Sequence, residues 1–501
     1  MGVARFFDRN YAAIGAALSI SRGALERTLA ARTIGLLCGP DVEGNANARW
    51  TAEMTVALLA RLYPRLSLEA PPAFADALTA LALAINPLIE IVPGDDLETA
   101  IVIGAQRSPS ANAIFAGARG WVVHVARTPV PVGGPENPYA AGAAGCIAVG
   151  EAFRQVFRAS LRPWVEPRDI ALSLLDFGPG AGASLPVPDV DLAEVAFFGL
   201  GAVANGALWA LGRHRAARGV AWLIDGETVD LSNLQRYVLA ADVDEGRSKP
   251  DLAAEALRGT GIEPRPRAVK LEKFADGYLT SFSIPTVCVS TDNVPARRAT
   301  QALLPRTVLN GFTGDRSLGT SWHRFSDDAA CLACLYHPDR PGKDHAQIVG
   351  ERLGLGRQRA GFLWASRVPL TDQDLRTIAD HLGTSVADLA PWRGRALQDL
   401  YSDVVCGSVA LDVRGIGRLE TVPLAHQSAL AGVLMAAELV KRSHPELETF
   451  SQPERLVSWD DVLRPPPPPG RWASRRSRAP GCFCSDRDYQ AVYRRKWPVG
   501  R

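Results

Sequence analysis

Two glycines and one aspartate near the middle of the chain have the types and spacing of a nucleotide site. Gly199 and Gly201 follow one apolar run, and Asp225 ends the next. Glycines let backbone N–H groups approach phosphates closely, and the N-terminus of a following helix favours negative charge. An aspartate after the second strand can accept a hydrogen bond from a ribose hydroxyl. These residues therefore predict binding of a phosphorylated nucleoside.

The elements that must position these residues are a strand, a glycine turn, a helix and a second strand. The pattern predicts buried strands in VAFFGLG, from Val195, and in VAWLIDGE, from Val220, with a helix through Trp209 and Leu211 between them. This order is the nucleotide-binding unit of a Rossmann-like fold. Many such folds share the glycine signature, including nicotinamide-dependent dehydrogenases, so the signature alone does not choose between them.

More specific residues follow this unit. The segment DLSNLQRY contains Asn233 and Arg236, GRSKPDLA contains Lys249, and STDNVPARR contains Asp292 and Asn293. Together with the glycine turn and the aspartate, these segments closely resemble the ThiF/MoeB/HesA family, whose adenylating domains are shared with ubiquitin-activating enzymes. The family pattern is a glycine-rich turn, an aspartate, S-N-L-x-R, a lysine, and a D-N pair before a helix. All of these parts occur here in the same order.

The resemblance implies roles for these polar residues in adenylation, which joins a carboxylate to the α-phosphate of ATP and expels pyrophosphate. Arg236 and Lys249 would contact the phosphates, and Asp292 would hold Mg²⁺, with Asn233 beside them. Positive charge is needed because negative charge accumulates in the transition state. The plainer alternative is that the two cations lie at the surface and Asp292 caps a helix. Tyr237 departs from the family, which usually has glutamine there.

The same resemblance implies a nucleophile at Cys406. In ThiF-like and ubiquitin-activating enzymes a cysteine in this region attacks the acyl-adenylate, and a thiolate is the reactive form. Cys406 precedes an expected small-residue helix from Leu424, at a longer distance than in the family. A buried structural thiol is the alternative, because V-V-C is compatible with an apolar strand.

Four other cysteines have the composition of a metal site. Cys331 and Cys334 form the C-x-x-C of CLACLYHP, and Cys482 and Cys484 form a C-x-C near the end of the chain. The first pair resembles the CxxCLxP element of the MoeB/ThiF family, whose zinc site is completed by a later cysteine pair. Four thiolates suit a closed tetrahedral structural zinc site; free thiols are the alternative. The remaining cysteines are expected to be packing residues: Cys38, Cys146 and Cys288.

Composition limits the class of protein and of partner. The 501-residue chain is 47% hydrophobic and 22% charged, with a formal net charge of +2, which argues against a nucleic-acid partner bound by bulk electrostatics. Basic residues near the end are expected to form a solvated surface. No apolar run has membrane-spanning length or the form of a secretion signal, and eight cysteines in such a chain indicate reduced thiols. We therefore expect a cytoplasmic protein.

The order of elements in the second half recurs in the first. Strands are predicted from Thr33, Thr99 and Trp121, followed by a small-residue helix at Ala141–Phe157. An internal duplication and an unrelated α/β domain are both compatible with this pattern. A duplicated first half would have lost its chemistry, because it has GAQ at Gly104–Gln106 in place of TDN and no S-N-L-x-R.

The expected fold is therefore α/β, with two Rossmann-like adenylation-type domains, the first degenerate and the second active. An inactive copy packed on an active one is typical of ubiquitin-activating enzymes. In the family, an arginine near the N-terminus of one copy reaches the other's site, and Arg9 is the candidate. The boundaries we expect are a degenerate domain at 1–177, a linker at 178–190, an active domain at 191–450 with a helical insertion at 340–403, and a Pro-rich linker and zinc segment at 451–501.

The resemblance thus favours an activating enzyme for a ubiquitin-like protein, which would use ATP, Mg²⁺ and Zn²⁺ and pass its substrate to a conjugating enzyme. It is similar to the activating enzymes of bacterial ubiquitination-like operons linked to phage defence. No nucleic-acid or membrane partner is expected, and further dimerisation is open. The alternatives are a sulfur-carrier adenylyltransferase of thiamine or molybdopterin biosynthesis, a dehydrogenase, and a catalytically dead scaffold. A dehydrogenase gives no role to Asn233 or Lys249, and a dead scaffold would be expected to lose Arg236 or Asp292.

Overall fold

A computed structural model gives the structure of the chain and describes residues 3–94, 97–106, 108, 110, 112–276, 282–325, 329–337, 345–401, 423–451 and 455–498. The chain divides into two compact units, each described by itself below. The larger unit contains both β-sheets and the C-terminal segment. The smaller unit contains four helices that lie between the cysteine pairs in sequence, with Tyr11–Ser19. Among the described residues, no helix has both the length and the hydropathy needed to cross a bilayer.

The first half of the larger unit is a seven-stranded sheet in the order β3-β2-β1-β4-β5-β6-β7. Strands β1 to β5 run parallel, and β6 and β7 add antiparallel strands. Parallel strands buried on both faces read as continuous apolar runs, and β1 and β4 are buried at every residue. The strands are β1 (Ile34–Cys38), β2 (Arg65–Glu69), β3 (Glu90–Ile91), β4 (Thr99–Ile103), β5 (Asn112–Arg119), β6 (Val122–Ala126) and β7 (Ile170–Ser173).

The second half is an eight-stranded sheet in the order β10-β9-β8-β11-β12-β13-β14-β15. Its first five strands in this order are parallel, and the rest are antiparallel. The strands are β8 (Val190–Phe198), β9 (Ala217–Ile224), β10 (Gly261–Arg267), β11 (Thr286–Val289), β12 (Thr307–Thr313), β13 (Leu318–His323), β14 (Arg455–Trp459) and β15 (Ala473–Arg475). The two sheets share one strand order, so the prediction of two Rossmann-like sheets is confirmed.

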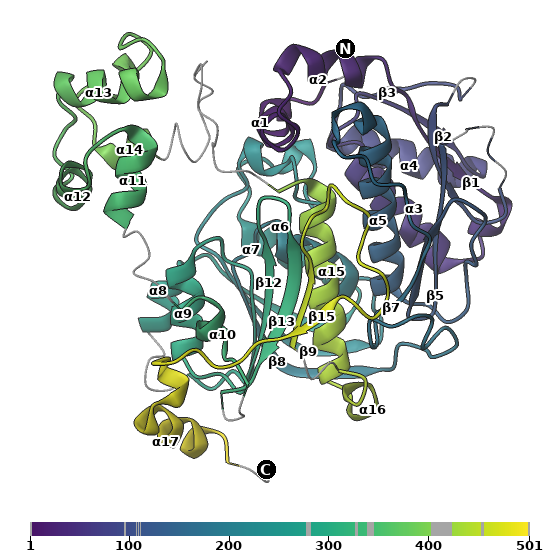
Figure 1. The fold of residues 1–501 in the computed structure, drawn as a ribbon. Helices are drawn as coiled ribbons and strands as arrows, with labels where there is room; N and C mark the ends of the chain where they lie inside the picture. Colours follow the sequence, from purple (N-terminus) through teal and green to yellow (C-terminus); the bar gives the residue numbers. More distant parts are fainter. Residues whose placement is uncertain are drawn as a thin grey trace. The chain divides into compact units, whose positions relative to one another are not determined.

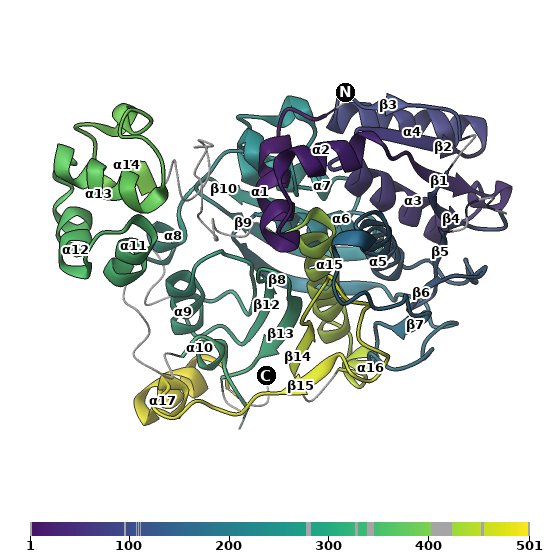
Figure 2. The same cartoon turned by 45° about the horizontal axis from the view of Figure 1, so that its top comes forward.

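Helices cover these sheets in corresponding positions. The first half has α2 (Arg22–Ala30), α3 (Ala46–Leu59), α4 (Pro72–Ile85) and α5 (Pro138–Val156). Helix α1 (Phe7–Leu18) is divided between the units, because its residues from Tyr11 belong to the smaller one. The second half has α6 (Ala202–Leu211), α7 (Lys249–Ala256), α8 (Leu271–Asp276), α9 (Val294–Ala302), α10 (Leu332–Leu335), α15 (Ala425–Arg442), α16 (Pro445–Glu448) and α17 (Arg487–Lys496). Helices α5 and α15 lie side by side where the two halves meet, as Figure 1 and Figure 2 both show.

Two buried ion pairs reinforce the likeness of the halves. Glu151 and Arg154 form an ion pair in α5, and Glu438 and Lys441 form one at the same positions of α15. In each helix the cation also binds backbone carbonyls outside it: Lys441 donates to Leu174 and Leu175 at 2.9 and 2.8 Å. Buried charges persist only when they are paired and hydrogen-bonded in this way. Equivalent pairs in equivalent helices therefore support an internal duplication.

Glycines in α5 and α15 set the close packing of each helix on its own half. A Cβ on Gly145 would lie 2.9 Å from the Thr51 carbonyl oxygen of α3, and one on Gly432 would lie 1.9 Å from the Val203 carbonyl oxygen of α6. Only glycine permits such an approach of two helix backbones. The same small-residue contact thus recurs in both halves.

The smaller unit has its own apolar core around Leu353, Leu375, Ile378 and Trp392. Thr371 caps the third of its helices and forms the predicted capping box with Asp374, whose carboxylate also binds Arg359 at 2.8 Å. That ion pair and the cap oppose the effect of burial and lower the pKa of Asp374 to about 2. The helices are α11 (His345–Leu353), α12 (Arg357–Ser366), α13 (Asp372–Leu382) and α14 (Leu397–Leu400).

Candidate functional site

The glycine turn packs directly on the loop that follows β11. Gly199 comes immediately after β8 and has φ +82°, a left-handed conformation that favours glycine. A Cβ at this position would lie 3.0 Å from Thr291 Cγ2 and 3.1 Å from the Thr291 amide nitrogen. The Ser290 hydroxyl donates to the Gly199 carbonyl at 2.8 Å. Gly201 follows as the N-cap residue of α6, so two separate strand ends meet at one turn.

Asp225, at the end of β9, forms hydrogen bonds to the same turn. Its two carboxylate oxygens accept the backbone N–H groups of Leu200, at 2.7 Å, and Glu227, at 2.9 Å. Burial raises the pKa of Asp225, while Lys249 and the two N–H donors oppose that rise. The carboxylate thus lies between the glycine turn and the lysine of the predicted set.

The segment from Asp230 to Ala240, which we call the nucleotide loop, carries Asn233 and Arg236. Asp230 caps a short 3₁₀ helix (Leu231–Asn233), and the Asn233 side-chain oxygen accepts the Asp230 N–H at 3.1 Å. This reciprocal cap satisfies backbone donors that a free loop would leave open. Asn233 is therefore a structural cap as well as a predicted site residue.

Two cations of the predicted set flank one aromatic ring. The ring centroid of Tyr237 lies 5.9 Å from the Arg236 guanidinium carbon and 5.5 Å from Lys249 Nζ. Tyr237 is 3% exposed, and a Cβ on Gly201 would lie 3.5 Å from its hydroxyl. A cation within about 6 Å of a ring face is attracted by the ring quadrupole. The residue that departs from the family pattern thus lies at the centre of the cluster.

Both cations have shifted pKa values. Burial alone would lower the pKa of Lys249, but Tyr237, Asp225 and a 2.5 Å contact with Glu227 outweigh it, so the pKa lies above its usual value. Burial lowers the pKa of Arg236, and Tyr237, Asp292 and Asp230 oppose that shift. Both groups carry positive charge near neutral pH.

The D-N pair follows β11 and opens α9. Asn293 is the N-cap residue of α9, and its oxygen accepts the Ala296 N–H at 2.8 Å. Its amide nitrogen donates to Asp292 Oδ1 at 3.2 Å, and both side chains are exposed. Asp292 is within electrostatic range of both Arg236 and Arg297. The structure thus brings the predicted adenylation residues together at the carboxyl ends of β8, β9 and β11, where ligands bind in open α/β sheets.

Arg297 belongs to the STDNVPARR motif, but its residue type and spacing predicted no function for it. This side chain is 7% exposed and donates to the Asn310 side chain and, at 3.1 Å, to the Gly311 carbonyl. Asn310 in turn donates to Ser321 at 2.9 Å. Arg297 therefore links α9 to β12, five residues after Asp292 in the chain. The sequence feature that could have indicated its supporting role was its position close after the D-N pair.

The corresponding edge of the first sheet has different chemistry. A Cβ on Gly39 would lie 2.8 Å from the Ala105 amide nitrogen, and one on Gly199 would lie 3.1 Å from that of Thr291. The match of GAQ to TDN is therefore shifted by one residue, and Gln106 rather than Ala105 stands where Asp292 does. Gln106 donates to Glu69 at 2.6 Å, and Asp41 accepts the Ala105 N–H at 2.9 Å. Two acids therefore line this turn, and a phosphate there would meet negative charge.

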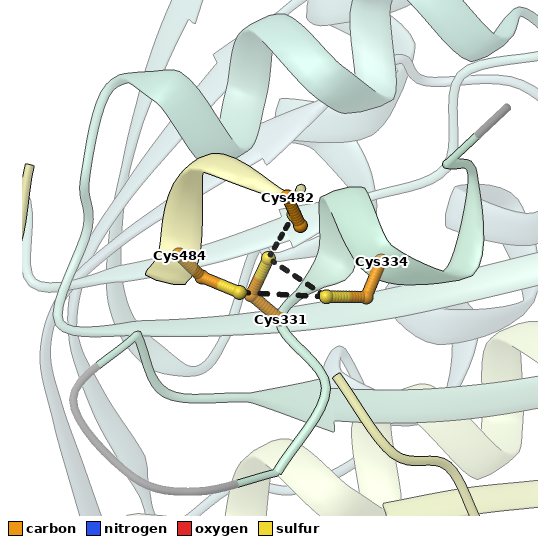
Figure 3. Close-up of side chains that lie close together, drawn as sticks. All are labelled: Cys331, Cys334, Cys482 and Cys484. Atoms are coloured by element: carbon orange, nitrogen blue, oxygen red, sulfur yellow. Dashed lines mark hydrogen bonds between the residues drawn. The ribbon is translucent and has the colours of Figure 1, made fainter. Parts of the chain in front are cut away.

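The four predicted metal ligands form one buried cluster, shown in Figure 3. The Sγ separations are 3.7 Å for Cys331–Cys334 and Cys331–Cys482, and 3.4 Å for Cys334–Cys484. Thiolates about 2.3 Å from a tetrahedral zinc ion lie about 3.8 Å apart. The Ala479 N–H also donates to Cys334 Sγ at 3.3 Å. The cluster could hold a metal ion.

The cluster lies in a small apolar core with aromatic residues from three segments. Phe325 stacks on Phe483 with ring centroids 5.7 Å apart and contacts Tyr493 at 5.5 Å. Gln490 of α17 donates to the carbonyls of Phe325 and Cys484, at 2.9 and 2.8 Å. The cysteine pairs therefore connect the last helix to α10.

The other predicted residues are divided between buried positions and parts that the structure does not cover. Cys38, Cys146 and Cys288 are buried, and burial is the main cause that raises their thiol pKa values, to about 12 for Cys38. Cys406 lies in 402–422, outside the described residues. Arg9 belongs to α1, but its side chain is outside the described part of the structure.

Comparison with known proteins gives two family matches and several similar proteins. The ThiF family matches residues 193–458, and a second family, described as prokaryotic E2 family C, matches residues 41–158. An uncharacterized protein of Sinorhizobium fredii, y4jF, is 34% identical over 99% of this chain and 98% of its own. The NEDD8-activating enzyme E1 catalytic subunit of Dictyostelium discoideum is 34% identical over 19% of this chain and 21% of its own.

Among solved structures, E. coli MccB is similar at 14% identity, with a TM-score of 0.37, over 67% of this chain and 73% of its own. The family match covers more than half of the chain and spans the glycine turn, the nucleotide loop and the D-N pair. The chain therefore belongs to the ThiF family and is an adenylyltransferase-like activating enzyme.

Proposed function

We propose that the second half of this chain activates the C-terminal carboxylate of a ubiquitin-like protein with ATP. The observation that carries the proposal is the convergence of Arg236 and Lys249 on the ring of Tyr237, with Asp292 within electrostatic range of Arg236, at the edge of the second sheet. Two cations beside one exposed carboxylate suit a polyphosphate and its metal ion.

Each residue has a proposed role. The N-terminus of α6, which Gly201 caps, receives the phosphates. The N–H groups of Gly199 and Leu200 hold the turn itself, because they donate to the Ile224 carbonyl and to Asp225. Asp225 orders that turn and accepts from the ribose. Asp292 would hold Mg²⁺, which would neutralise negative charge on the phosphates. The remaining binding residues are Asn233 and Asn293, which fix the loops on either side.

In the proposed reaction, a carboxylate oxygen of the substrate attacks the α-phosphorus of ATP and the bond to the β-phosphate oxygen breaks. Pyrophosphate leaves with the bonding electrons, and an acyl-adenylate remains. The Arg236 and Lys249 side chains stabilise the charge that develops on the phosphates, because both remain cationic near neutral pH. The Cys406 thiolate then attacks the acyl carbon, AMP leaves, and the thioester passes to a conjugating enzyme.

The first half is proposed to be catalytically inactive. Asp41 and Glu69 line its turn and Gln106 takes the position of Asp292. Its match to a prokaryotic E2 family covers residues 41–158, where the one cysteine is Cys146. That thiol is 1% exposed within α5, so an acyl group could not reach it without opening the helix packing. We assign the first half a supporting role within the pseudo-dimer.

The cysteine cluster is proposed to bind a structural zinc ion through Cys331, Cys334, Cys482 and Cys484. The sulfur separations of 3.4 to 3.7 Å are close to those of a tetrahedral site. Closed four-thiolate sites stabilise a fold rather than catalyse a reaction, because no coordination position is open to substrate. The protein would act in the cytoplasm, where thiols remain reduced.

The test is ATP–pyrophosphate exchange by the full chain with candidate ubiquitin-like proteins, compared with the Asp292→Asn variant. We expect the wild type to catalyse pyrophosphate exchange and the Asp292→Asn variant to do so at least about 100-fold more slowly. Absence of exchange with every candidate modifier would contradict the assignment.

The thioester step is tested separately with Cys406→Ala. This variant should retain exchange but lose a dithiothreitol-sensitive adduct with the modifier. An adduct that persists would assign the thioester to another cysteine. Exchange without any adduct in the wild type would instead favour a sulfur-carrier adenylyltransferase.

A further inference from the structure

A buried arginine of the first half reaches the nucleotide loop of the second half. Arg61 follows α3 and is 1% exposed. Its Nη1 atom donates to the Leu234 carbonyl at 2.6 Å and its Nη2 atom donates to the Ala240 carbonyl at 2.7 Å. These contacts join residues that are 173 and 179 positions apart in the chain.

The two carbonyls bracket the part of the loop that carries the chemistry. Arg236 and Tyr237 lie between Leu234 and Ala240, and Tyr237 in turn contacts Lys249. Movement of either end of this segment would therefore move Arg236 and Tyr237 relative to Lys249 and Asp292. A displacement of about 1 Å at a reacting centre can cost about 100-fold in rate.

Other anchors of this segment come from the second half. The Leu239 N–H donates to the Asn205 side chain of α6 at 3.3 Å, and the Gln235 amide donates to the Pro423 carbonyl at 3.4 Å. These contacts are longer than those of Arg61 and neutral. Hydrogen bonds with an ionised donor are roughly twice as strong as neutral ones. Arg61 therefore supplies the strongest of these described anchors, and it does so from the first half.

The environment of Arg61 explains why the side chain must be arginine. Its planar guanidinium can donate to two separate carbonyls at once, whereas a lysine ammonium on a flexible stem is a point charge. Burial lowers the pKa of Arg61, and the Asp244 carboxylate partly opposes this. The Asn10 side chain holds the Arg61 backbone carbonyl at 2.6 Å. The backbone of Arg61 is thus held by Asn10, and the two Nη atoms of its guanidinium bind the nucleotide loop.

We propose that Arg61 is a positioning residue, through which the first half holds Arg236 and Tyr237 of the nucleotide loop in their working positions. The expected effect of Arg61 on adenylation rests on the proposed function. Its effect on the order of the loop is independent of that function. Arg61 touches no reacting atom and acts through the backbone of the loop. The first half then contributes directly to the order of the site and is more than a packing partner.

The experiment compares Arg61→Lys with Arg154→Lys in the full-length protein. Arg154 is a matched control because it is also 1% exposed, belongs to the first half and donates to two backbone carbonyls, those of Leu463 and Val165. Those carbonyls lie outside the nucleotide loop. A second control, Arg5→Ala, removes surface ion pairs to Asp242 and Glu245 just beyond the loop.

The readouts are amide hydrogen exchange of residues 231–241, the thermal midpoint, and KM for ATP with kcat in pyrophosphate exchange. Arg61→Lys is expected to speed hydrogen exchange in this segment by about tenfold or more and to lower kcat/KM by about 10- to 100-fold. Arg154→Lys should lower the thermal midpoint, while amide hydrogen exchange in residues 231–241 should stay at the wild-type rate. Arg5→Ala should change neither the loop nor kcat/KM.

Equal hydrogen exchange of the loop in Arg61→Lys and wild type would overturn the proposal. Equal acceleration in Arg61→Lys and Arg154→Lys would overturn it as well, because it would indicate general destabilisation. If the wild type shows no pyrophosphate exchange, the proposed function fails, while the hydrogen-exchange comparison still decides the role of Arg61 in ordering the loop.

Discussion

Gly199 and Thr291 lie so close that no side chain fits between them. A Cβ on Gly199 would be 3.0 Å from Thr291 Cγ2 and 3.1 Å from the Thr291 backbone nitrogen. The turn after β8 and the loop that carries Asp292 are therefore one packed structure. Any change at this contact should affect both the phosphate turn and the proposed metal ligand.

The first prediction concerns Gly199→Ala. Its φ of +82° should cost an alanine about 1 to 2 kcal/mol, and the contact with Thr291 should displace Asp292 in addition. Gly246→Ala is the matched control, because Gly246 has φ +86° but nothing within 4 Å of its Cβ position. Both variants should lose stability by thermal unfolding, with a larger loss in Gly199→Ala because of the contact with Thr291, and pyrophosphate exchange should fall at least about tenfold further in Gly199→Ala. Equal activity in the two variants would contradict the packed-turn explanation.

The second prediction concerns the buried cation. Lys249→Ala removes a side chain that is 6% exposed and leaves Asp225 and Glu227 without their positive neighbour. Pyrophosphate exchange should fall about 100-fold or more, because a preorganised charge at the phosphates is lost. Arg258→Ala removes a cation that is 76% exposed and pairs with Glu255 at the surface, so its exchange rate should equal that of the wild type. A similar loss in both variants would assign the effect to net charge.

The third prediction concerns the cysteine cluster. Elemental analysis of the purified protein should give about one zinc per chain, and Cys484→Ser should lose that zinc and lower the unfolding midpoint. Cys288→Ser is the control, because Cys288 is buried in β11 away from the cluster. It should destabilise the protein while zinc content is unchanged. Full zinc content in Cys484→Ser would rule out the four-thiolate site.

The fourth prediction concerns pH and a buried histidine. His426 of α15 is 4% exposed, packs beside Phe153 with ring centroids 6.0 Å apart, and has a pKa that burial lowers to about 4. Between pH 6.5 and 4, the unfolded chain binds a proton at this residue that the folded chain does not, so the free energy of unfolding falls as pH falls. The contribution is complete above pH 6.5, and the loss approaches about 3 kcal/mol at pH 4.

The pH effect is measured as a difference, because other histidines titrate in the same range. Urea unfolding of the wild type and of His426→Gln is compared at pH 7.5, 6 and 5. The wild type should lose more stability than the variant at each step towards acid, and the groups common to both should cancel. Parallel pH profiles would mean that His426 is not kept neutral by burial.

The sequence by itself determined the family and the class of fold, and it predicted the chemistry. The strands predicted from Val195 and Val220 and the motifs of the second half are local patterns: a buried apolar run, a glycine turn, a D-N pair before a helix. Parallel α/β sheets place the carboxyl ends of their strands at one edge, so motifs at Gly199, Asp225 and Asp292 had to converge once the strands formed. The likeness of the two halves was also visible, because both repeat the same order of apolar runs.

Only the tertiary structure decided which partners these residues meet. Tyr237 lies between Arg236 and Lys249, Arg61 crosses from the first half to Leu234 and Ala240, and Arg297 links α9 to β12. Each of these contacts joins positions that are brought together by packing of helices and sheets, and no local periodicity encodes such a pairing. The cysteine pairs illustrate the division: their types and spacing indicate a metal, but 150 residues separate Cys334 from Cys484, and the fold alone places their sulfur atoms 3.4 Å apart.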